Sequence, residues 1–423
     1  MSAIAIVTCV AGTIVSWMNE RNIYNPAFLM SALWTIITVL VNTPLVNYYE
    51  IDDLVYVIIT LGMLSFYLGC YISRHVAIRS RKKTLPNSTP IMNYTAVIIL
   101  SVISILLLVF PAIDSIRSLR LGYTNYSEIR NSITNPYHNR ILVLVYHFVV
   151  RFFSVAIIPI ATVELFFSKK SNKIIIVSAI LIIALRCIIE GGRIIILNLV
   201  FCLFIGRLIT NRSFNISKKV KRYIYIVLAI SLAGFLYIST ARGITHFGTH
   251  FLMYICGCVP QLSIRIDSLG SFQHTYGCAS LNGYMIYVLS FLNRLGLPVA
   301  NFSSYVQSLL SVENRIAIGP TSSMNAFVSQ FYYMYVDGGV MGVVIGMMIY
   351  GIVSHNLYKK AKNLTSARSM ALYFLIVETI VTSMVRFQFT NIAFAMSVFY
   401  ILLVKNVDLR ADVETPVMRD GKK

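Results

Sequence analysis

The chain consists of long apolar runs separated by short polar connections. The runs are about 17–25 residues long, the length with which an α-helix crosses a hydrocarbon core of about 30 Å. This pattern predicts an all-α fold, a polytopic transmembrane helix bundle. The expected spans, about eleven in number, cover residues 2–18, 27–47, 54–73, 91–111, 141–167, 174–189, 194–210, 223–241, 339–357, 370–386 and 390–404.

Basic residues mark alternate connections between these runs. They gather at 79–83, 169–170, 218–222 and 359–360, and in the tail that ends at Lys423. Cytoplasmic loops carry an excess of Lys and Arg, so we expect a periplasmic N-terminus and a cytoplasmic C-terminus. The first run lacks the basic segment of a signal peptide, and we expect it to be a retained span.

The pattern divides the chain into three parts. Residues 1–241 are expected to form an eight-span bundle, 242–338 a long periplasmic loop, and 339–423 three spans and a cytoplasmic tail. The loop is mildly apolar and punctuated by Gly and Pro. Within it, residues 283–294 are expected to form a short helix lying at the membrane interface.

Composition supports the same class. The chain has 423 residues, of which 57% are hydrophobic and 12% charged. Its mean hydropathy of +0.73 excludes an ordinary soluble domain. A net charge of +20 would suggest nucleic acid as a partner of a soluble protein. In a membrane protein it reports topology and anionic lipid, and we expect no nucleic-acid partner.

Lysine and arginine are distributed unequally across the expected topology. All fourteen lysines fall on the cytoplasmic side, which carries a net charge of +19. Counted with the residues at the span ends, the periplasmic side carries ten arginines, no lysine and a net charge of +1. Arginine has a planar fork that binds phosphate with two hydrogen bonds, whereas lysine is a hydrated point charge. The pattern predicts an outer face that binds molecules bearing phosphate.

Two arginines are tied to ends of expected spans. Glu190-Gly-Gly-Arg193 forms a tight outer connection, where backbone N–H groups and Arg193 could hold a phosphate. The alternative is a turn with a snorkelling arginine. Arg242 follows the eighth span at the same height. Further arginines for substrate binding are Arg140, Arg265 and Arg315, with Arg294 also on the outer side.

Arg151 lies about ten residues into the fifth span. A charge at mid-membrane costs about 3 kcal/mol on insertion scales, so we expect Arg151 to face the bundle interior or a wet cavity. Glu378 in the tenth span is a partner of suitable charge. Their ion pair would either fix the order of the helices or serve the substrate.

The outer histidines allow two roles. His246 and His250 lie one helical turn apart, a spacing that can bind metal. A third ligand is missing nearby, so we expect no metal and regard a proton acceptor or hydrogen-bond donor as the role of His250 or His274.

The cysteines fall into two groups. Cys9, Cys70, Cys187 and Cys202 lie in expected spans, where a small apolar filler is the usual role. The other three, Cys256, Cys258 and Cys278, lie outside the spans and could form one disulfide.

A tyrosine-rich run ends in Asp337-Gly-Gly and enters the ninth span. Glycines at 338, 339, 342 and 346 suit close helix contact. Asp337 is expected near the start of this helix, where a carboxylate caps the helix dipole, either alone or together with a substrate or catalytic contact. Tyr335 suits an interfacial belt or a wall on which a sugar stacks.

These stretches resemble the Wzy-type O-antigen and capsule repeat-unit polymerases. The resemblance rests on the run into Asp337-Gly-Gly, the Gly-Gly-Arg193 hairpin and the large outer loop between late spans. It implies a bacterial inner-membrane enzyme with a GT-C-like helical fold that joins undecaprenyl-pyrophosphate-linked oligosaccharides on the periplasmic side. It also implies that Arg193 and, more loosely, Arg242 grip substrate. Whether a chain-length regulator is a further partner stays open.

The chemistry of such an enzyme agrees with the residues. A sugar hydroxyl attacks the anomeric carbon of the donor glycan, and lipid pyrophosphate leaves. Fixed arginines would stabilise the charge that develops on the leaving group, so no cofactor is expected. The base that takes the hydroxyl proton would come from Asp337, Glu190, Asp267, Glu313 or an outer histidine such as His250.

Three other functions remain open. An O-antigen ligase-type enzyme uses the same donor with a lipid A-core acceptor. A lipid-linked oligosaccharide flippase usually has repeat-related halves and short outer loops, which this chain lacks. A purely structural membrane protein would not need lysine-free arginine loops.

Overall fold

Helices make up most of this computed structural model. The structure describes residues 1–75, 94–120, 137, 139–168, 172–190, 194–210, 247–312, 314–320, 322–324, 327–363 and 366–402. The chain divides into two compact units. The first comprises residues 1–80, 243–356 and 376–396, and the second comprises 81–242, 357–375 and 397–423. Each unit therefore combines segments that lie far apart in the sequence.

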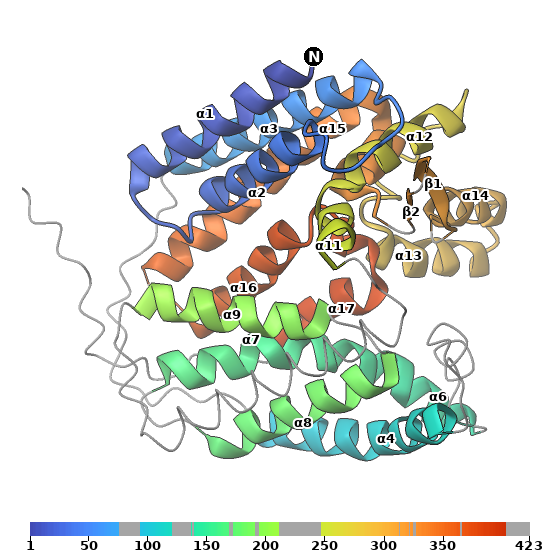
Figure 1. Ribbon diagram of the computed structural model, residues 1–423. Coiled ribbons are helices and arrows are strands. Elements are labelled where there is room, and N and C mark those ends of the chain that lie inside the picture. Colours follow the sequence, from blue (N-terminus) through green and yellow to red (C-terminus); the bar gives the residue numbers. More distant parts are fainter. Residues whose placement is uncertain are drawn as a thin grey trace, which may run out of the picture. The chain divides into compact units, whose positions relative to one another are not determined.

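The first unit contains the N-terminal helices and most of the long loop. Its helices are α1 (Ser2–Glu20), α2 (Pro26–Val41), α3 (Asp53–His75), α11 (Phe247–Cys256), α12 (Cys258–Leu269), α13 (Asn282–Arg294), α14 (Ala300–Leu310) and the larger part of α15 (Ser329–Lys362). Figure 1 shows α1, α2 and α3 side by side. Trp34 of α2 is fully buried, where its ring packs on Phe331 of α15 and its indole N–H donates to the Ser383 hydroxyl over 3.1 Å.

A short hairpin interrupts the helical pattern of the first unit. Strands β1 (Ile316–Gly319) and β2 (Ser322–Met324) pair antiparallel, with Ile316 opposite Met324. The Tyr49 amide donates to the Ile318 carbonyl oxygen over 3.0 Å, so β1 is also tied to the connection after α2. No strand was expected here, because strands this short leave no extended alternating pattern in the sequence.

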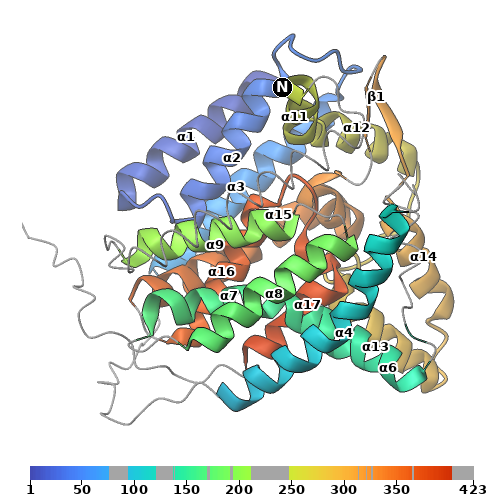
Figure 2. The same cartoon turned by 60° about the horizontal axis from the view of Figure 1, so that its bottom comes forward.

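The second unit is formed around α4 (Tyr94–Arg120), α7 (Arg151–Phe167) and α8 (Lys173–Glu190). It also contains α6 (Arg140–Val145), the π-helical turn η1 (Tyr146–Val150) and α9 (Ile194–Thr210). Figure 2 shows α8 lying between α4 and α7. The last helices, α16 (Ala367–Val381) and α17 (Ile392–Ile401), contribute to both units, with the 3₁₀ turn η2 (Gln388–Thr390) between them.

Several helices have the length and composition of membrane spans. Five are long and apolar enough to cross a membrane: Ser2–Glu20, Asp53–His75, Tyr94–Ser118, Arg140–Phe167 and Ser329–Lys362. Shorter apolar helices cover Pro26–Val41, Ile195–Ile209 and Ile392–Ile401. A helix is present at each expected span except 223–241, which lies outside the described residues. The total of about eleven spans stays a prediction.

The end of α2 differs from the expectation. The apolar run continues to residue 47, but the helix ends at Val41. Pro44 disfavours helical backbone at the residue before it. The side chains of Asn42 and Thr43 then donate to the carbonyl oxygens of Thr38 and Leu40, over 2.7 and 2.6 Å. Local turn chemistry therefore overrides hydrophobicity at this boundary.

Two glycines bring α3 and α15 into backbone contact. A Cβ added at Gly69 would lie within 3.0 Å of the Met348 carbonyl oxygen, and one added at Gly351 would meet the Phe66 carbonyl oxygen equally closely. The Cys70 thiol donates to the Gly351 carbonyl oxygen over 3.5 Å in the same contact. Close packing through small residues is how helices associate where no water drives them together.

We predict that Gly351→Ala destabilises the protein although alanine is the better helix former. The added methyl group must push backbone against backbone, at a cost of about 1–3 kcal/mol. The matched control is Gly346→Ala on the same helix, where the nearest atoms belong to the flexible Met334 side chain. Thermal unfolding in detergent should give a lower midpoint for Gly351→Ala than for the control. Equal midpoints would mean that the helices separate freely at this point.

Candidate functional site

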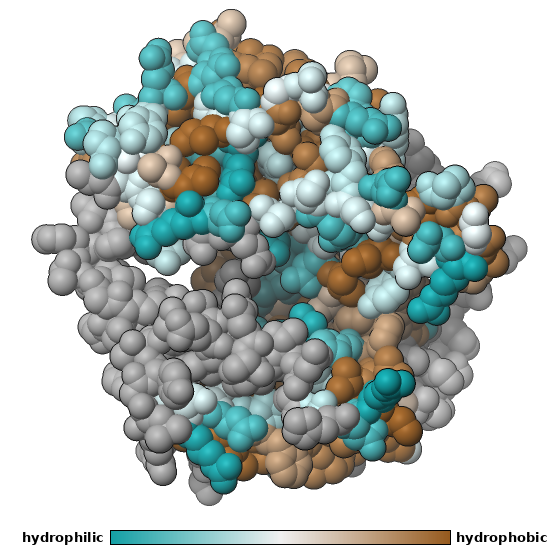
Figure 3. Space-filling view, turned by 90° about the vertical axis from the view of Figure 1, so that its right-hand side faces the viewer, coloured by the Kyte–Doolittle hydropathy of each residue, from teal (hydrophilic) through white to brown (hydrophobic). Residues whose placement is uncertain are grey.

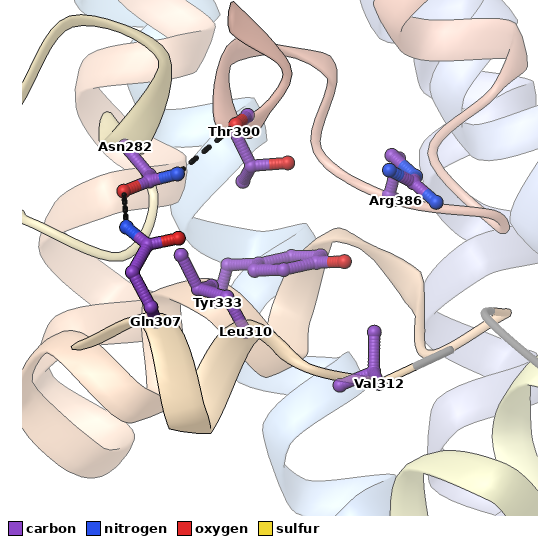
Figure 4. A pocket seen from close by; sticks show the side chains of 7 residues that line it. All are labelled: Asn282, Gln307, Leu310, Val312, Tyr333, Arg386 and Thr390. Atoms are coloured by element: carbon purple, nitrogen blue, oxygen red, sulfur yellow. Dashed lines mark hydrogen bonds between the residues drawn. The ribbon is translucent and has the colours of Figure 1, made fainter. Parts of the chain in front are cut away.

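A polar cavity of about 140 Å³ lies within the first unit. It is lined by Asn282 at the start of α13, Gln307 and Leu310 of α14, Val312 after that helix, Tyr333 of α15, Arg386 and Thr390. Figure 4 shows these side chains arranged around it. Most of the lining side chains can donate or accept hydrogen bonds, so the cavity suits a polar ligand.

One wall of the cavity is held by a side-chain amide pair. The Gln307 amide donates to the Asn282 side-chain oxygen over 2.8 Å, and the Asn282 amide donates to the Thr390 carbonyl oxygen over 3.5 Å (Figure 4). These bonds join α13, α14 and η2. The wall is therefore built by three elements that lie up to about a hundred residues apart in sequence.

Arg386 supplies the positive charge of the cavity. It follows the end of α16, where its backbone N–H donates to the Thr382 carbonyl oxygen over 3.1 Å. The residue is half-buried. Among the residues that the structure describes, no hydrogen bond or ion pair involves its guanidinium group. A partly desolvated arginine in a polar cavity is suited to bind an anion.

A second arginine lies behind the Val312 segment. Arg265 of α12 donates from Nη2 to the carbonyl oxygens of Val312 and Asn314, over 3.2 and 2.9 Å. Its Nε atom is buried and has no hydrogen-bond partner among the described residues. Arg265 thus holds a segment of the cavity wall, and much of its hydrogen-bonding capacity is used by the backbone.

Asp337 binds the turn that leads into α13. Its Oδ1 atom accepts hydrogen bonds from the Thr275 hydroxyl at 2.6 Å and the Ala279 amide at 2.9 Å, and its Oδ2 atom accepts from the Ser280 amide at 3.0 Å. Its backbone carbonyl oxygen also accepts from the Tyr276 amide at 3.0 Å. We call this set of bonds the Asp337 clasp. The side chain is 8% exposed, so its carboxylate is an anchor with both oxygens occupied.

The clasp lies directly before a break in α15. Gly338 has extended backbone, and Gly339 has φ 60° and ψ −147°, a conformation that side chains with a Cβ rarely adopt. The expected position of Asp337 at a helix start is therefore correct for the segment after the break. Its carboxylate does not cap that helix, because the 275–280 turn binds it.

Cys278 lies inside the turn that the clasp holds. Burial, and then the negative charge of Asp337, raise the pKa of its thiol. All seven cysteines are free, so the disulfide considered among Cys256, Cys258 and Cys278 is absent. The three residues are buried and do not meet one another as a bonded pair.

The other predicted residues of the first unit are spread over its surface. Arg315 is exposed before β1, and Asp267 is exposed on α12. Tyr335 is half-buried, and its ring lies 5.8 Å from that of Phe272. Beside the break in α15, His274 has a buried Nδ1 atom without a hydrogen-bond partner among the described residues.

Two of the predicted site residues that the structure describes belong to the second unit. Glu190 ends α8 and accepts a hydrogen bond from Arg186 Nε over 2.9 Å, within an ion pair. This pairing leaves Glu190 poorly placed as a base, because Arg186 already occupies its carboxylate. Arg140 is exposed at the start of α6.

Arg151 differs from the expectation. It is exposed, and its Nη1 atom lies 3.2 Å from Nδ1 of His147, one turn earlier. Of the two predicted surroundings, the bundle interior was therefore wrong, and a wet cavity stays a prediction. A π-helical turn directly precedes Arg151. This turn rotates the residues after it to another side of the helix, which a prediction based on the regular helical period does not include.

Several predicted site residues lie outside the described residues. These are Arg193, Arg242 and Glu313, together with the side chain of His250, whose backbone belongs to α11. No group of three or more His, Cys, Asp or Glu side chains within the described ranges could hold a metal ion.

The cavity residues Asn282, Gln307, Arg386 and Thr390 were not singled out from the sequence. Arg386 ends an expected span, and a single cation there usually indicates a solvated rim charge. A usable signal was the polar sequence Arg-Phe-Gln-Phe-Thr-Asn after an apolar run. Such a sequence marks the end of an apolar helix, and it contains more polar side chains than a helix cap requires. No comparable sequence feature marks Asn282 and Gln307.

The long apolar helices are typical of a membrane protein. Comparisons of the chain with protein-family models, curated proteins and solved structures gave no match.

We predict that Asp337→Asn exposes Cys278. The amide nitrogen cannot accept a hydrogen bond from an N–H donor, and loss of a bond to a charged group costs about 1.5–3 kcal/mol. Since each 1.4 kcal/mol is about tenfold in an equilibrium, the open turn should be about ten times more populated or more. Loss of the negative charge also lowers the thiol pKa and increases the reactive thiolate.

The measurement is the rate of maleimide labelling at pH 7.5 in a variant that retains only Cys278. The matched control is Asp267→Asn, which removes an exposed carboxylate. An unchanged rate in Asp337→Asn would show that the turn holds without the carboxylate.

Proposed function

We propose that this protein is a membrane glycosyltransferase that polymerises undecaprenyl-pyrophosphate-linked oligosaccharide repeat units on the periplasmic side of a bacterial inner membrane. The product would be O-antigen or capsular polysaccharide. The observation that carries the proposal is the cavity itself. There the guanidinium group of Arg386, without a hydrogen bond or ion pair among the described residues, lies with the polar groups of Asn282, Gln307 and Thr390.

The side chains that line the cavity match both the sugar and the phosphate groups of such a substrate. Amide and hydroxyl groups match the hydroxyls of a sugar, and the Tyr333 ring offers an apolar surface for a sugar face. The guanidinium group of Arg386 matches a phosphate oxygen pair. A lysine-free outer side with ten arginines supports the same preference for phosphate.

In the proposed reaction an acceptor hydroxyl attacks the anomeric carbon of the donor glycan. The bond from that carbon to the pyrophosphate oxygen breaks, and the new glycosidic bond forms. Negative charge develops on the departing pyrophosphate, where a fixed guanidinium group stabilises it. The hydroxyl proton passes to a base.

The contacts of the candidate bases narrow the choice. Asp337 and Glu190 are engaged by hydrogen bonds and by Arg186. Asp337 then serves best as a positioning residue that fixes the turn before Asn282. Asp267 and His274 remain as described candidates for the base, and neither lines the cavity.

The experiment that tests the proposal is a deletion strain whose surface glycan is separated on a gel. Loss of a polymerase should leave single repeat units attached to the acceptor. A strain with no repeat unit attached would instead support the ligase-type enzyme or the flippase. Full ladders would contradict all of these functions.

We predict that Arg386→Lys lowers the rate of polymer formation about a hundredfold, the usual effect of removing one group that stabilises a developing negative charge. Lysine keeps the charge but loses the fork. The matched control is Arg117→Ala, another outer arginine, whose side chain is 74% exposed and lies far from the cavity in sequence. Ladder formation in the complemented deletion strain is the readout, with membrane levels of each variant measured by immunoblot. Normal ladders in Arg386→Lys would remove the guanidinium fork from the mechanism.

A further inference from the structure

Helix α13 has two faces of different character. Gly283 packs so closely that an added Cβ would approach Ala395 and the carbonyl oxygens of Phe389 and Asn391 within 3.0 Å. The opposite face carries large apolar side chains that no part of the described structure covers. They are Leu281, Val288, Phe291 and Leu295, with exposed fractions of 43%, 43%, 61% and 63%.

These four positions form one stripe. They are spaced by seven, three and four residues, which places them on the same side of a helix. Leu297, 48% exposed, extends the apolar surface into the turn before α14. The face of the molecule in Figure 3, which carries α13 and α14 in Figure 1, shows hydrophobic side chains beside hydrophilic ones.

The hairpin of α13 and α14 is anchored on its inner side. The Tyr305 hydroxyl exchanges hydrogen bonds with both backbone groups of Gln273, at 2.9 and 3.0 Å. The Tyr332 hydroxyl donates to the Leu309 carbonyl oxygen over 3.0 Å. The Tyr284 ring stacks on Phe389. A hairpin fixed in this way presents its apolar stripe rigidly.

Two properties of the hairpin match a phospholipid surface. Helix α13 has 13 residues and is thus about 20 Å long, too short to cross a bilayer. Its packing partner at Gly283 is the first turn of α17, an apolar helix. In the expected topology residues 387–389 connect the last two spans, so the first turn of α17 and the α13 residues packed on it would lie at the membrane surface.

Charge gives a second, independent argument. Residues 268–312 contain no Asp or Glu, and Arg294 is their one cation. Arg294 is exposed at the end of α13, directly beside Leu295 of the stripe. An acid-free segment with one arginine does not repel lipid phosphate groups and offers them one cation. A helix with this arrangement lies in the plane of the interface.

We propose that the apolar stripe of α13 and the Leu295–Leu297 turn insert into the surface of a phospholipid bilayer, with Arg294 at the level of the lipid phosphates. Asn282 and Gln307 come from the same hairpin and line the polar cavity. The insertion would hold that cavity next to the lipid surface. The inference concerns lipid contact and does not depend on the reaction proposed above.

The test places a nitroxide label on the stripe in the full chain, reconstituted in vesicles of phosphatidylcholine and phosphatidylglycerol. Phe291→Cys and Leu295→Cys are labelled separately, and Ser304→Cys on the exposed side of α14 is the matched control. Six of the native cysteines are buried, and labelled wild-type protein gives the background from the seventh, Cys187. Electron paramagnetic resonance then measures collisions with oxygen, which concentrates in lipid, and with a water-soluble nickel complex.

Insertion predicts a several-fold higher ratio of oxygen to nickel collisions at 291 and 295 than at 304. Equal ratios would place the stripe in water and overturn the proposal. Low collision rates with both reagents would show that protein covers the stripe, which also overturns it. Two label positions and an unchanged thermal midpoint separate these outcomes from misfolding of one variant.

Discussion

The Asp337 clasp is the interaction on which the outer part of the first unit depends. One carboxylate satisfies a hydroxyl and two backbone amides of the turn between Thr275 and Ser280, in a place with little access to water. Buried amides need such partners, because their desolvation is costly. Asn282 follows the turn directly and forms a wall of the cavity with Gln307. The Asp337 carboxylate therefore positions the cavity wall, although Asp337 itself does not line the cavity.

An arginine that donates hydrogen bonds to backbone carbonyl oxygens is less available to a ligand than one that does not. Arg265 donates to two backbone carbonyl oxygens and thereby holds the Val312 segment in place. Arg386, which lines the cavity formed in part by Val312, has no such engagement among the described residues. Two chemically identical groups near one segment thus have different roles. Their roles differ because backbone carbonyl oxygens lie within reach of Arg265 and bind it. Counting the arginines in the sequence does not reveal this.

Much of the helical architecture could be predicted from the sequence, because an apolar run of sufficient length has few alternatives to a helix. Helix ends were less predictable: Pro44 stops α2 early, and the break at Gly338 and Gly339 divides α15. The candidate site was predicted only in outline. Asp337 was identified from its position, but its role as an anchor depends on Thr275 and its neighbours about sixty residues earlier. Arg386 was not recognised because its surroundings come from α13, α14 and η2, and no local pattern connects these segments.

The contact of α3 with α15 has a consequence for how this sequence can change over time. Side chains on the outward faces of these helices, such as Leu64 and Ile349, are exposed and can be exchanged for other apolar residues at little cost. Gly69 and Gly351 cannot, because each occupies a space that only a hydrogen atom fits. Homologous chains could therefore diverge at most positions of both helices and still share this crossing. The two glycine positions would therefore be the first to align between homologous sequences of low overall identity.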